Sequence, residues 1–330
     1  MSAPPRPADR PRTATAPAAG RLRHGVVLLP EHPWSRAAAL WAHAERLGFD
    51  HAWTYDHLRW RFLHAQDWYG AVPTLAAAAT VTSRIRLGTL VASPAYRHPV
   101  TLAKELATLD DISGGRLICG LGAGGGGYDE EMLGGPPLTP AQRAERFEEF
   151  VTLTKALLRG DGHEARGRWF ATHRARLRPT GAQRPRIPLA VAATGPRGMR
   201  LAARHAETWV TAGAPGWGEP RRFDAALPLL RRQTEELARA CADTSRDPAS
   251  LRRMLVTGAM VTGVTDSVAA YQDACAMVAE LGFTDLVVHW PRDTFPYRGR
   301  LDVLEDIAAE VLASRTAPAP PAAPDPGPLP

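Results

Sequence analysis

The sequence predicts an α/β fold in which a single (β/α)8 barrel of the TIM type forms the domain. Eight short apolar runs alternate in order with eight segments of helical periodicity. No change of composition divides this array into two domains, and 330 residues accommodate a barrel of about 250 residues. An open doubly wound sheet is the alternative, but it usually has fewer strands and would leave some helices without a place.

The predicted strands are short runs rich in β-branched and other apolar residues. They are Arg23–Leu29, His51–Tyr55, Ile85–Ala92, Leu117–Leu121, Ile187–Ala193, Thr208–Thr211, Met254–Val261 and Asp285–His289. The predicted helices fill the intervals, and several begin at a proline, which is favoured in a first helical turn. They are Trp34–Leu47, Tyr69–Thr82, Pro99–Ile112, Pro140–Arg159, Pro196–His205, Arg222–Ala242, Asp266–Leu281 and Arg300–Ala313.

The stretch from Arg84 to Tyr128 shows the repeating unit most clearly. An apolar run ends at Ser93-Pro94, and a helix with apolar residues at helical spacing follows from Pro99. A second apolar run then leads into the glycines of 122–127. Two apolar strands joined through a helix indicate parallel strands that are covered on both faces.

The two ends of the chain differ in composition from the barrel. Residues 1–20 are rich in Pro, Ala and Arg, and residues 316–330 are nearly all Pro and Ala. Such segments cannot bury apolar area, so both are expected to be disordered tails. The catalytic domain is therefore expected to span residues 21–315.

Three connections are longer than a barrel requires. Asp56–Tyr69 follows the second predicted strand, Gly122–Thr139 follows the fourth, and Gly160–Arg186 joins the fourth helix to the fifth strand. Loops at the C-terminal ends of barrel strands build active sites, and the first two connections lie at that end.

Composition excludes several classes of protein. No run approaches the 18 or so apolar residues of a membrane helix, and the N-terminus has no apolar signal segment. Cys119, Cys241 and Cys275 lack C-x-x-C spacing, which favours a cytoplasmic protein without a zinc site. The net charge of +6 comes from scattered arginines, so nucleic acid is not an expected partner, while an anionic substrate or cofactor stays open.

Tyr55-Asp56-His57 lies where the second strand meets its loop, at the rim expected to be catalytic. A histidine that titrates near neutrality suits proton transfer, and the neighbouring carboxylate can bind or orient. His51, His57 and His64 do not share one helical face and no common ligand set is completed, so no metal site is expected.

Gly122–Gly127 satisfies G-x-G-x-x-G after a strand, but Gly134–Pro137 prevents the long helix that a dinucleotide fingerprint requires. We interpret this glycine segment as a loop whose backbone can lie close to a flat cofactor ring. The alternative is a flexible loop without a ligand. Asp129–Glu131 is expected to be the solvated start of a loop. The segment Ala193-Thr194-Gly195-Pro196 ends a predicted strand and begins a predicted helix. This arrangement leaves backbone N–H groups at the helix N-terminus free to bind a phosphate.

The chain resembles the luciferase-like family of flavin and deazaflavin oxidoreductases in four segments: LGTLVASP, RHPV, ATLDDISGGR and LGAG. The resemblance implies coenzyme F420 as cofactor, with FMN as the alternative, because of the Tyr-Asp-His and AATGP words. It implies that the protein is a homodimer with a small-molecule substrate and that a separate cofactor reductase serves it.

The resemblance also implies roles for particular residues. His57 would be catalytic on the substrate side of the cofactor, and Trp60 and Tyr128 would form the substrate pocket. The remaining implied positions bind the cofactor: Asp56, Leu90, Val91, Ser93, Gly122 and Gly124 at its ring, and Ala193, Thr194, Gly195 and Pro196 at its phosphate. In the family, the peptide that corresponds to Leu90-Val91 is cis.

One departure bears on the substrate. Deazaflavin sugar-phosphate dehydrogenases carry a glutamate where this chain has Gly125, and usually an asparagine where it has Tyr128. The expected reaction is therefore hydride transfer to or from a C=C, C=N or C=O bond of another small molecule, for which an intermediate of secondary metabolism is a candidate. The first alternative is an FMN-dependent monooxygenase that uses reduced flavin and O2. The second is a barrel without catalytic activity that serves as a binding subunit.

Overall fold

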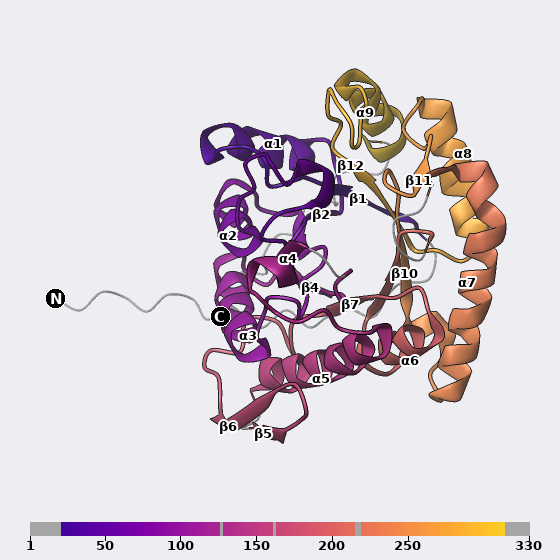
Figure 1. Cartoon of the computed structure of the whole chain (residues 1–330). Helices are drawn as coiled ribbons and strands as arrows, with labels where there is room; N and C mark the ends of the chain where they lie inside the picture. The colour runs from indigo at the N-terminus through magenta and orange to yellow at the C-terminus, as the bar shows by residue number, and fades with distance from the viewer. Residues whose placement is uncertain (1–20, 126–127, 161–162, 215–218, 314–330) are drawn as a thin grey trace, which may run out of the picture.

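The computed structural model describes residues 21–125, 128–160, 163–214 and 219–313. Eight parallel strands close into a barrel in the order β1-β12-β10-β8-β7-β4-β3-β2, with helices around the outside (Figure 1). The predicted TIM barrel is confirmed. The barrel strands are β1 (Arg23–Val27), β2 (His51–Thr54), β3 (Arg86–Thr89), β4 (Leu117–Leu121), β7 (Leu189–Ala192), β8 (Thr208–Thr211), β10 (Arg252–Val256) and β12 (Asp285–His289).

The helices of the outer ring agree with the predicted ones to within a few residues at each end. They are α1 (Trp34–Arg46), α2 (Ala71–Val81), α3 (Pro99–Ile112), α5 (Pro140–Arg159), α6 (Pro196–His205), α7 (Phe223–Asp243), α8 (Val268–Glu280) and α9 (Leu301–Ile307), which continues into the π-helical turn η3 (Ala308–Leu312). Local signals fix several ends: Thr139 and Gln142 form a capping box on α5, and Ser267 caps α8.

Short elements occupy the connections. The long segment between α5 and β7 contains an antiparallel hairpin, β5 (His163–Arg166) and β6 (Ala171–Ala175), which lies outside α5 in Figure 1. The β2 loop forms the turn η1 (Arg61–Leu63), and the β4 loop forms the short helix α4 (Tyr128–Met132). The other additions are β9 (Arg221–Arg222), β11 (Val261–Thr262) and η2 (Pro248–Ser250). Both predicted tails lie outside the described residues.

Two apolar layers hold the barrel together. One lies between the strands and the helices, and the other fills the barrel interior with side chains that include Trp53, Ile118 and Met254. Gly120 permits close contact between β4 and β3, because a Cβ there would lie 1.8 Å from the backbone oxygen of Thr89. The strands β3 and β4 lead to the residues predicted to hold the cofactor ring, Leu90, Val91, Ser93, Gly122 and Gly124, and this packing fixes the two strands to each other.

A polar network closes the base of the barrel interior. The His51 Nε2 lies 2.9 Å from Asp285, and the indole of Trp53 donates to His51 Nδ1 at 2.7 Å. Burial by itself raises the pKa of Asp285, but the hydrogen bond from His51 and the charge of Arg23 outweigh it and lower that pKa to about 2. His51 therefore has a structural role.

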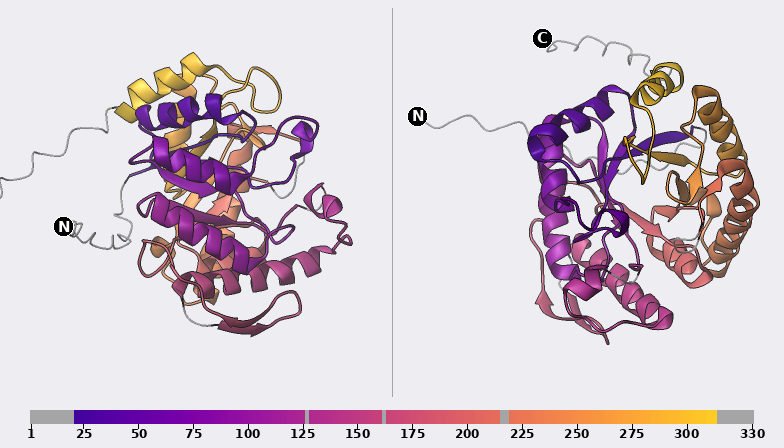
Figure 2. Two further views of the ribbon diagram at one scale, coloured as in Figure 1. Left: turned by 90° about the vertical axis from the view of Figure 1, so that its left-hand side faces the viewer. Right: turned by 45° about the horizontal axis from the view of Figure 1, so that its top comes forward.

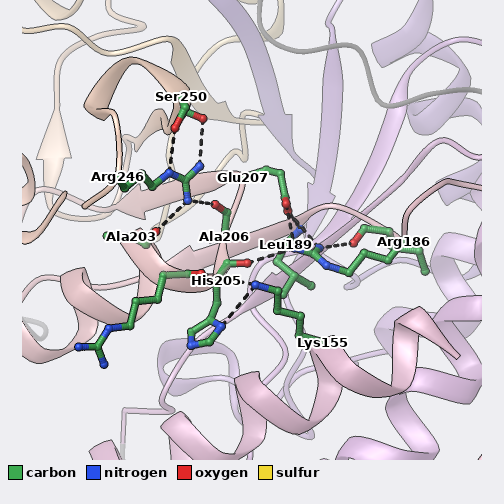
Figure 3. Close-up of polar contacts among 11 residues, drawn as sticks. Lys155, Arg186, Leu189, Ala203, His205, Ala206, Glu207, Arg246 and Ser250 are labelled. Atoms are coloured by element: carbon green, nitrogen blue, oxygen red, sulfur yellow. Dashed lines mark hydrogen bonds and ion pairs between the residues drawn. The ribbon is translucent and has the colours of Figure 1, made fainter. Parts of the chain in front are cut away.

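The C-terminus of α6 is held by cations, as Figure 3 shows. Arg246 donates to the carbonyls of Ala203 at 2.9 Å and Ala206 at 2.6 Å, and Arg186 donates to that of His205 at 3.1 Å. Cations at this end of a helix satisfy its last carbonyls and its dipole. These contacts orient α6, whose opposite end points to the candidate site.

Candidate active site

The candidate site lies at the C-terminal ends of the barrel strands, where the β2 loop and α4 meet (Figure 2, left). Asp56 directly follows this end of β2 and is fully buried. Arg97 donates to both of its carboxylate oxygens, at 2.7 and 3.1 Å, and the hydroxyl of Tyr96 donates to one of them. Asp56 therefore fixes the loop that follows β3, and its predicted contact with a cofactor ring stays a prediction.

His57 and Asp129 form a pair across the site. The imidazole Nδ1 lies 2.6 Å from Oδ2 of Asp129, whose Oδ1 accepts from the backbone N–H of Leu58 at 2.7 Å. Because an ionised carboxylate only accepts, Nδ1 carries the hydrogen and Nε2 is the nitrogen that can exchange a proton with a bound molecule. This contact fixes the orientation of the His57 ring.

Asp129 corrects an expectation from the sequence. Asp129 and Glu130 are buried in α4 and are not the solvated start of a loop. Glu130 pairs with Arg146 of α5, so both carboxylates have a partner in the folded chain. Local sequence shows only three acids in a row, and the contacts that bury two of them come from distant segments.

A small cavity of about 40 Å³ lies beside His57. Its wall comes from the β2 loop, the β3 loop and the β4 loop with α4: His57, Arg59, Trp60, Arg61, Ala95, Gly125, Tyr128, Asp129 and Glu130. The two residues predicted for the substrate pocket, Trp60 and Tyr128, both line it. Trp60 and Leu63 are buried and belong to the same apolar cluster as Leu90.

The predicted ring wall is brought together by β3 and β4. The Leu90-Val91 peptide is cis in the structure. A Cβ at Gly122 would lie 2.3 Å from Val91, and one at Gly124 would lie 2.6 Å from the hydroxyl of Ser93. These glycines allow the β4 loop to pass directly over the end of β3, which is a reason for glycine that the sequence pattern did not reveal.

The predicted phosphate loop lies at the N-terminus of α6. Among the described residues no side chain caps this end, and Gly195 is the N-cap. A Cβ at Gly195 would meet nothing within 4 Å, so the space before the helix is open. Ala193 is held in place because its carbonyl accepts from the indole of Trp209 at 2.8 Å. Backbone N–H groups at such an end can bind an anion.

A hydrogen-bonded chain that sequence reasoning missed lies next to His57, at the ends of β2 and β12. His289 Nδ1 donates to the carbonyl of Thr257 at 2.7 Å, so its Nε2 accepts from the Tyr55 hydroxyl at 2.8 Å. The Tyr55 oxygen then accepts from Tyr297 at 2.8 Å. Burial lowers the pKa of His289 to about 3, which keeps the ring neutral. The available signal was that His289 ends the last barrel strand at the catalytic rim.

Tyr297 connects this hydrogen-bonded chain to the β2 loop. Its ring stacks on His289 with centroids 3.7 Å apart, and Trp60 stacks at 5.9 Å. Its φ of 65° is uncommon for an aromatic residue and indicates that the surroundings impose the conformation. A larger cavity of about 360 Å³ lies beyond Tyr297, between the loops that follow β10 and β12.

In the described part of the chain, no group of three or more His, Cys, Asp or Glu side chains could hold a metal ion. Within the same residues, no helix has the length and apolar character needed to cross a bilayer.

Fold and site together define a TIM-barrel oxidoreductase with a histidine–aspartate pair at its mouth. The luciferase-like monooxygenase family model matches residues 12–315, and the chain belongs to this family. The predicted family is confirmed, and its relatives support the F420-dependent branch.

Two relatives and one solved structure show the range of this similarity. The chain is 32% identical to an F420-dependent glucose-6-phosphate dehydrogenase of Beutenbergia cavernae, over 82% of this chain and 90% of the dehydrogenase. It is 34% identical to a 4-hydroxyprotoasukamycin monooxygenase of Streptomyces nodosus subsp. asukaensis, over 59% of this chain and 54% of the monooxygenase. The match thus spans about half the length of the monooxygenase.

Among solved structures, an F420-dependent secondary alcohol dehydrogenase in complex with an F420-acetone adduct superposes with a TM-score of 0.70. The match has 18% sequence identity and covers 89% of this chain and 99% of that one. At 18% identity, this structural similarity is evidence for the fold alone.

Proposed function

We propose that this protein is a coenzyme F420-dependent oxidoreductase that transfers a hydride between the deazaflavin and a small organic substrate. The observation that carries the proposal is the His57–Asp129 pair, which leaves Nε2 of His57 as the proton-exchanging nitrogen beside a cavity that Gly125 of the β4 loop also lines. Relatives named for F420-dependent chemistry support the choice of cofactor.

The residues present fit such a cofactor in two respects. The open N-terminus of α6 suits its phosphate, with Thr194, Gly195 and Pro196 as the binding residues. Gly122 and Gly124 remove side chains where a flat ring needs close backbone approach, and Ser93 lies beside them. In addition, the indole Nε1 of Trp68 is a buried donor without a partner among the described residues, as expected where a ligand supplies an acceptor.

When bound, the deazaflavin supplies or accepts the hydride. His57 completes the balance by giving a proton to the substrate heteroatom or carbon during reduction, or by taking one during oxidation. Asp129 keeps Nδ1 protonated, so Nε2 carries the exchanging proton. Trp60, Asp129 and Glu130 are buried around this position, which limits the access of water.

The nearest alternative is an FMN-dependent monooxygenase that uses reduced flavin and O2. The specific observation in its favour is the 34% identity to a monooxygenase over 59% of this chain, against 32% to the glucose-6-phosphate dehydrogenase over 82%. The barrel, the ring wall and the α6 terminus suit either cofactor, so the distinction has to come from binding.

Fluorescence titration of the purified protein with F420 and with FMN tests the proposal. We expect tight binding of F420, weak binding of FMN, and no oxygen consumption with reduced cofactor. Tight FMN binding together with oxygen consumption would establish the FMN-dependent monooxygenase. Absence of binding to either cofactor would indicate a barrel without catalytic activity.

A further inference from the structure

We infer that the wall of the His57 cavity formed by Arg59, Arg61 and Tyr128 is a binding subsite for a carboxylate, so that the substrate is an organic acid. As a statement about substrate, this inference rests on the proposed function. As a statement about anion binding, it rests only on the arrangement of these side chains.

Arg61 supplies the first cation of this subsite. Its Nη2 lies 3.0 Å from the position that a Cβ at residue 125 would occupy, so the guanidinium extends across the η1 turn to the glycine loop after β4. The side chain lines the cavity together with His57. Burial lowers the pKa of Arg61, while the hydroxyls of Tyr128 and Tyr297 act in the opposite direction. A positive charge placed in a partly dehydrated site is stabilised when an anion binds beside it.

Arg59 supplies the second cation. Its guanidinium lies 4.9 Å from the centre of the Tyr128 ring, which fixes its direction. Its Nε is buried and, among the described residues, has no hydrogen-bond acceptor. The nearest acid is Glu131 at 3.8 Å, and that carboxylate is largely exposed. A ligand oxygen would satisfy the buried Nε.

The two carboxylates that line the same cavity are already engaged. Asp129 accepts from His57 and from the backbone of Leu58, and Glu130 pairs with Arg146. They therefore do little to neutralise Arg59. The cavity is lined by two arginines, one tyrosine and His57, which is an environment for an anion.

The size and chemistry of the cavity select the kind of anion. A volume of about 40 Å³ admits a group of a few heavy atoms, such as a carboxylate. Guanidinium groups bind carboxylates through paired, charge-assisted hydrogen bonds. Because His57 lines the same small cavity, the reacting carbon should lie within a few bonds of the carboxylate, as in a hydroxy acid, an oxo acid or an unsaturated acid.

Fluorine NMR titration tests the inference with two small probes of nearly equal shape, difluoroacetate and difluoroacetamide, in the absence of any cofactor. We expect wild type to bind the carboxylate about tenfold more tightly than the amide. R61M and R59M should lose this preference and leave the weak amide binding unchanged. R232M is the matched control, since Arg232 is exposed on α7, and it should bind as wild type does.

A second variant guards against effects of folding. G125D places a carboxylate next to the Arg61 guanidinium, so it should abolish difluoroacetate binding while the melting temperature stays near that of wild type. Equal binding of the two probes by wild type, no detectable difluoroacetate binding, or unchanged preference in R61M and G125D would each overturn the inference. Since no cofactor is present, failure to bind F420 would refute the proposed function and leave this result standing.

Discussion

The imidazole Nδ1 of His57 and the carboxylate Oδ2 of Asp129 lie 2.6 Å apart although 72 residues separate them in the chain. This contact joins the loop after β2 to the helix after β4 and fixes which nitrogen of His57 can exchange a proton. We predict that H57A lowers turnover by about 100-fold or more. Steady-state kinetics and cofactor titration should show that cofactor affinity survives. Unchanged turnover would remove His57 from the reaction.

Replacing the partner of His57 should act on the reaction through orientation alone. D129N keeps the shape of the side chain but no longer enforces one tautomer, so we expect turnover to fall by roughly 10- to 100-fold with KM changed by about twofold or less. E235Q is the control, because Glu235 is exposed on α7, away from the site. A matching rise of KM in D129N would instead indicate a role in substrate binding.

The N-terminus of α6 offers a clean test of the phosphate site. G195A introduces a methyl group where the structure has open space, so the fold should tolerate it, but a bound phosphate would lose its close contact with the backbone. We expect F420 affinity to fall by about tenfold with little change in melting temperature. G70A is matched to it, since Gly70 is likewise the N-cap of a helix and has room for a Cβ. Equal F420 affinity in the two variants would move the phosphate elsewhere.

The buried His289 makes stability depend on pH. Burial lowers its pKa to about 3 in the folded chain, against about 6.5 when unfolded, so between these values the unfolded chain binds the extra proton. Stability should therefore fall as pH decreases from about 6.5 towards 3, by about 1.4 kcal/mol per pH unit from this residue. Urea unfolding at several pH values should show a shallower dependence in H289Q, which can still accept from Tyr55 and donate to Thr257. H173Q, at an exposed histidine, should leave the dependence unchanged.

The cations at the end of α6 should contribute to stability and leave the chemistry untouched. R246M removes the donors to the carbonyls of Ala203 and Ala206, so we expect a loss of about 1–2 kcal/mol in the free energy of unfolding. R239M removes an exposed arginine of α7 as the control. Denaturant unfolding measures both variants, and equal stability of the two would show that solvent replaces the contacts of Arg246.

Much of the architecture follows from local sequence. The run Leu117–Leu121 and the helix Pro99–Ile112 have the predicted bounds, because hydrophobic periodicity and proline and glycine punctuation act within a few residues. His57 and Thr194–Pro196 could be selected as candidates because a barrel places every such strand end at one rim. The hairpin of β5 and β6 was not predicted, since its exposed strands have little apolar pattern.

The sequence by itself determined the barrel fold, the motifs of the family and the end of the barrel at which the candidate site residues lie. Only the tertiary structure decided how the candidates are connected: Asp129 orients His57, Arg61 occupies the space beside Gly125, and Tyr55 lies between His289 and Tyr297, which are 234 and 242 residues away. The physical reason is the distance along the chain over which each interaction acts. Backbone propensity and periodicity are set by near neighbours, whereas the partner that fixes a tautomer or removes a side chain from water is chosen by barrel closure.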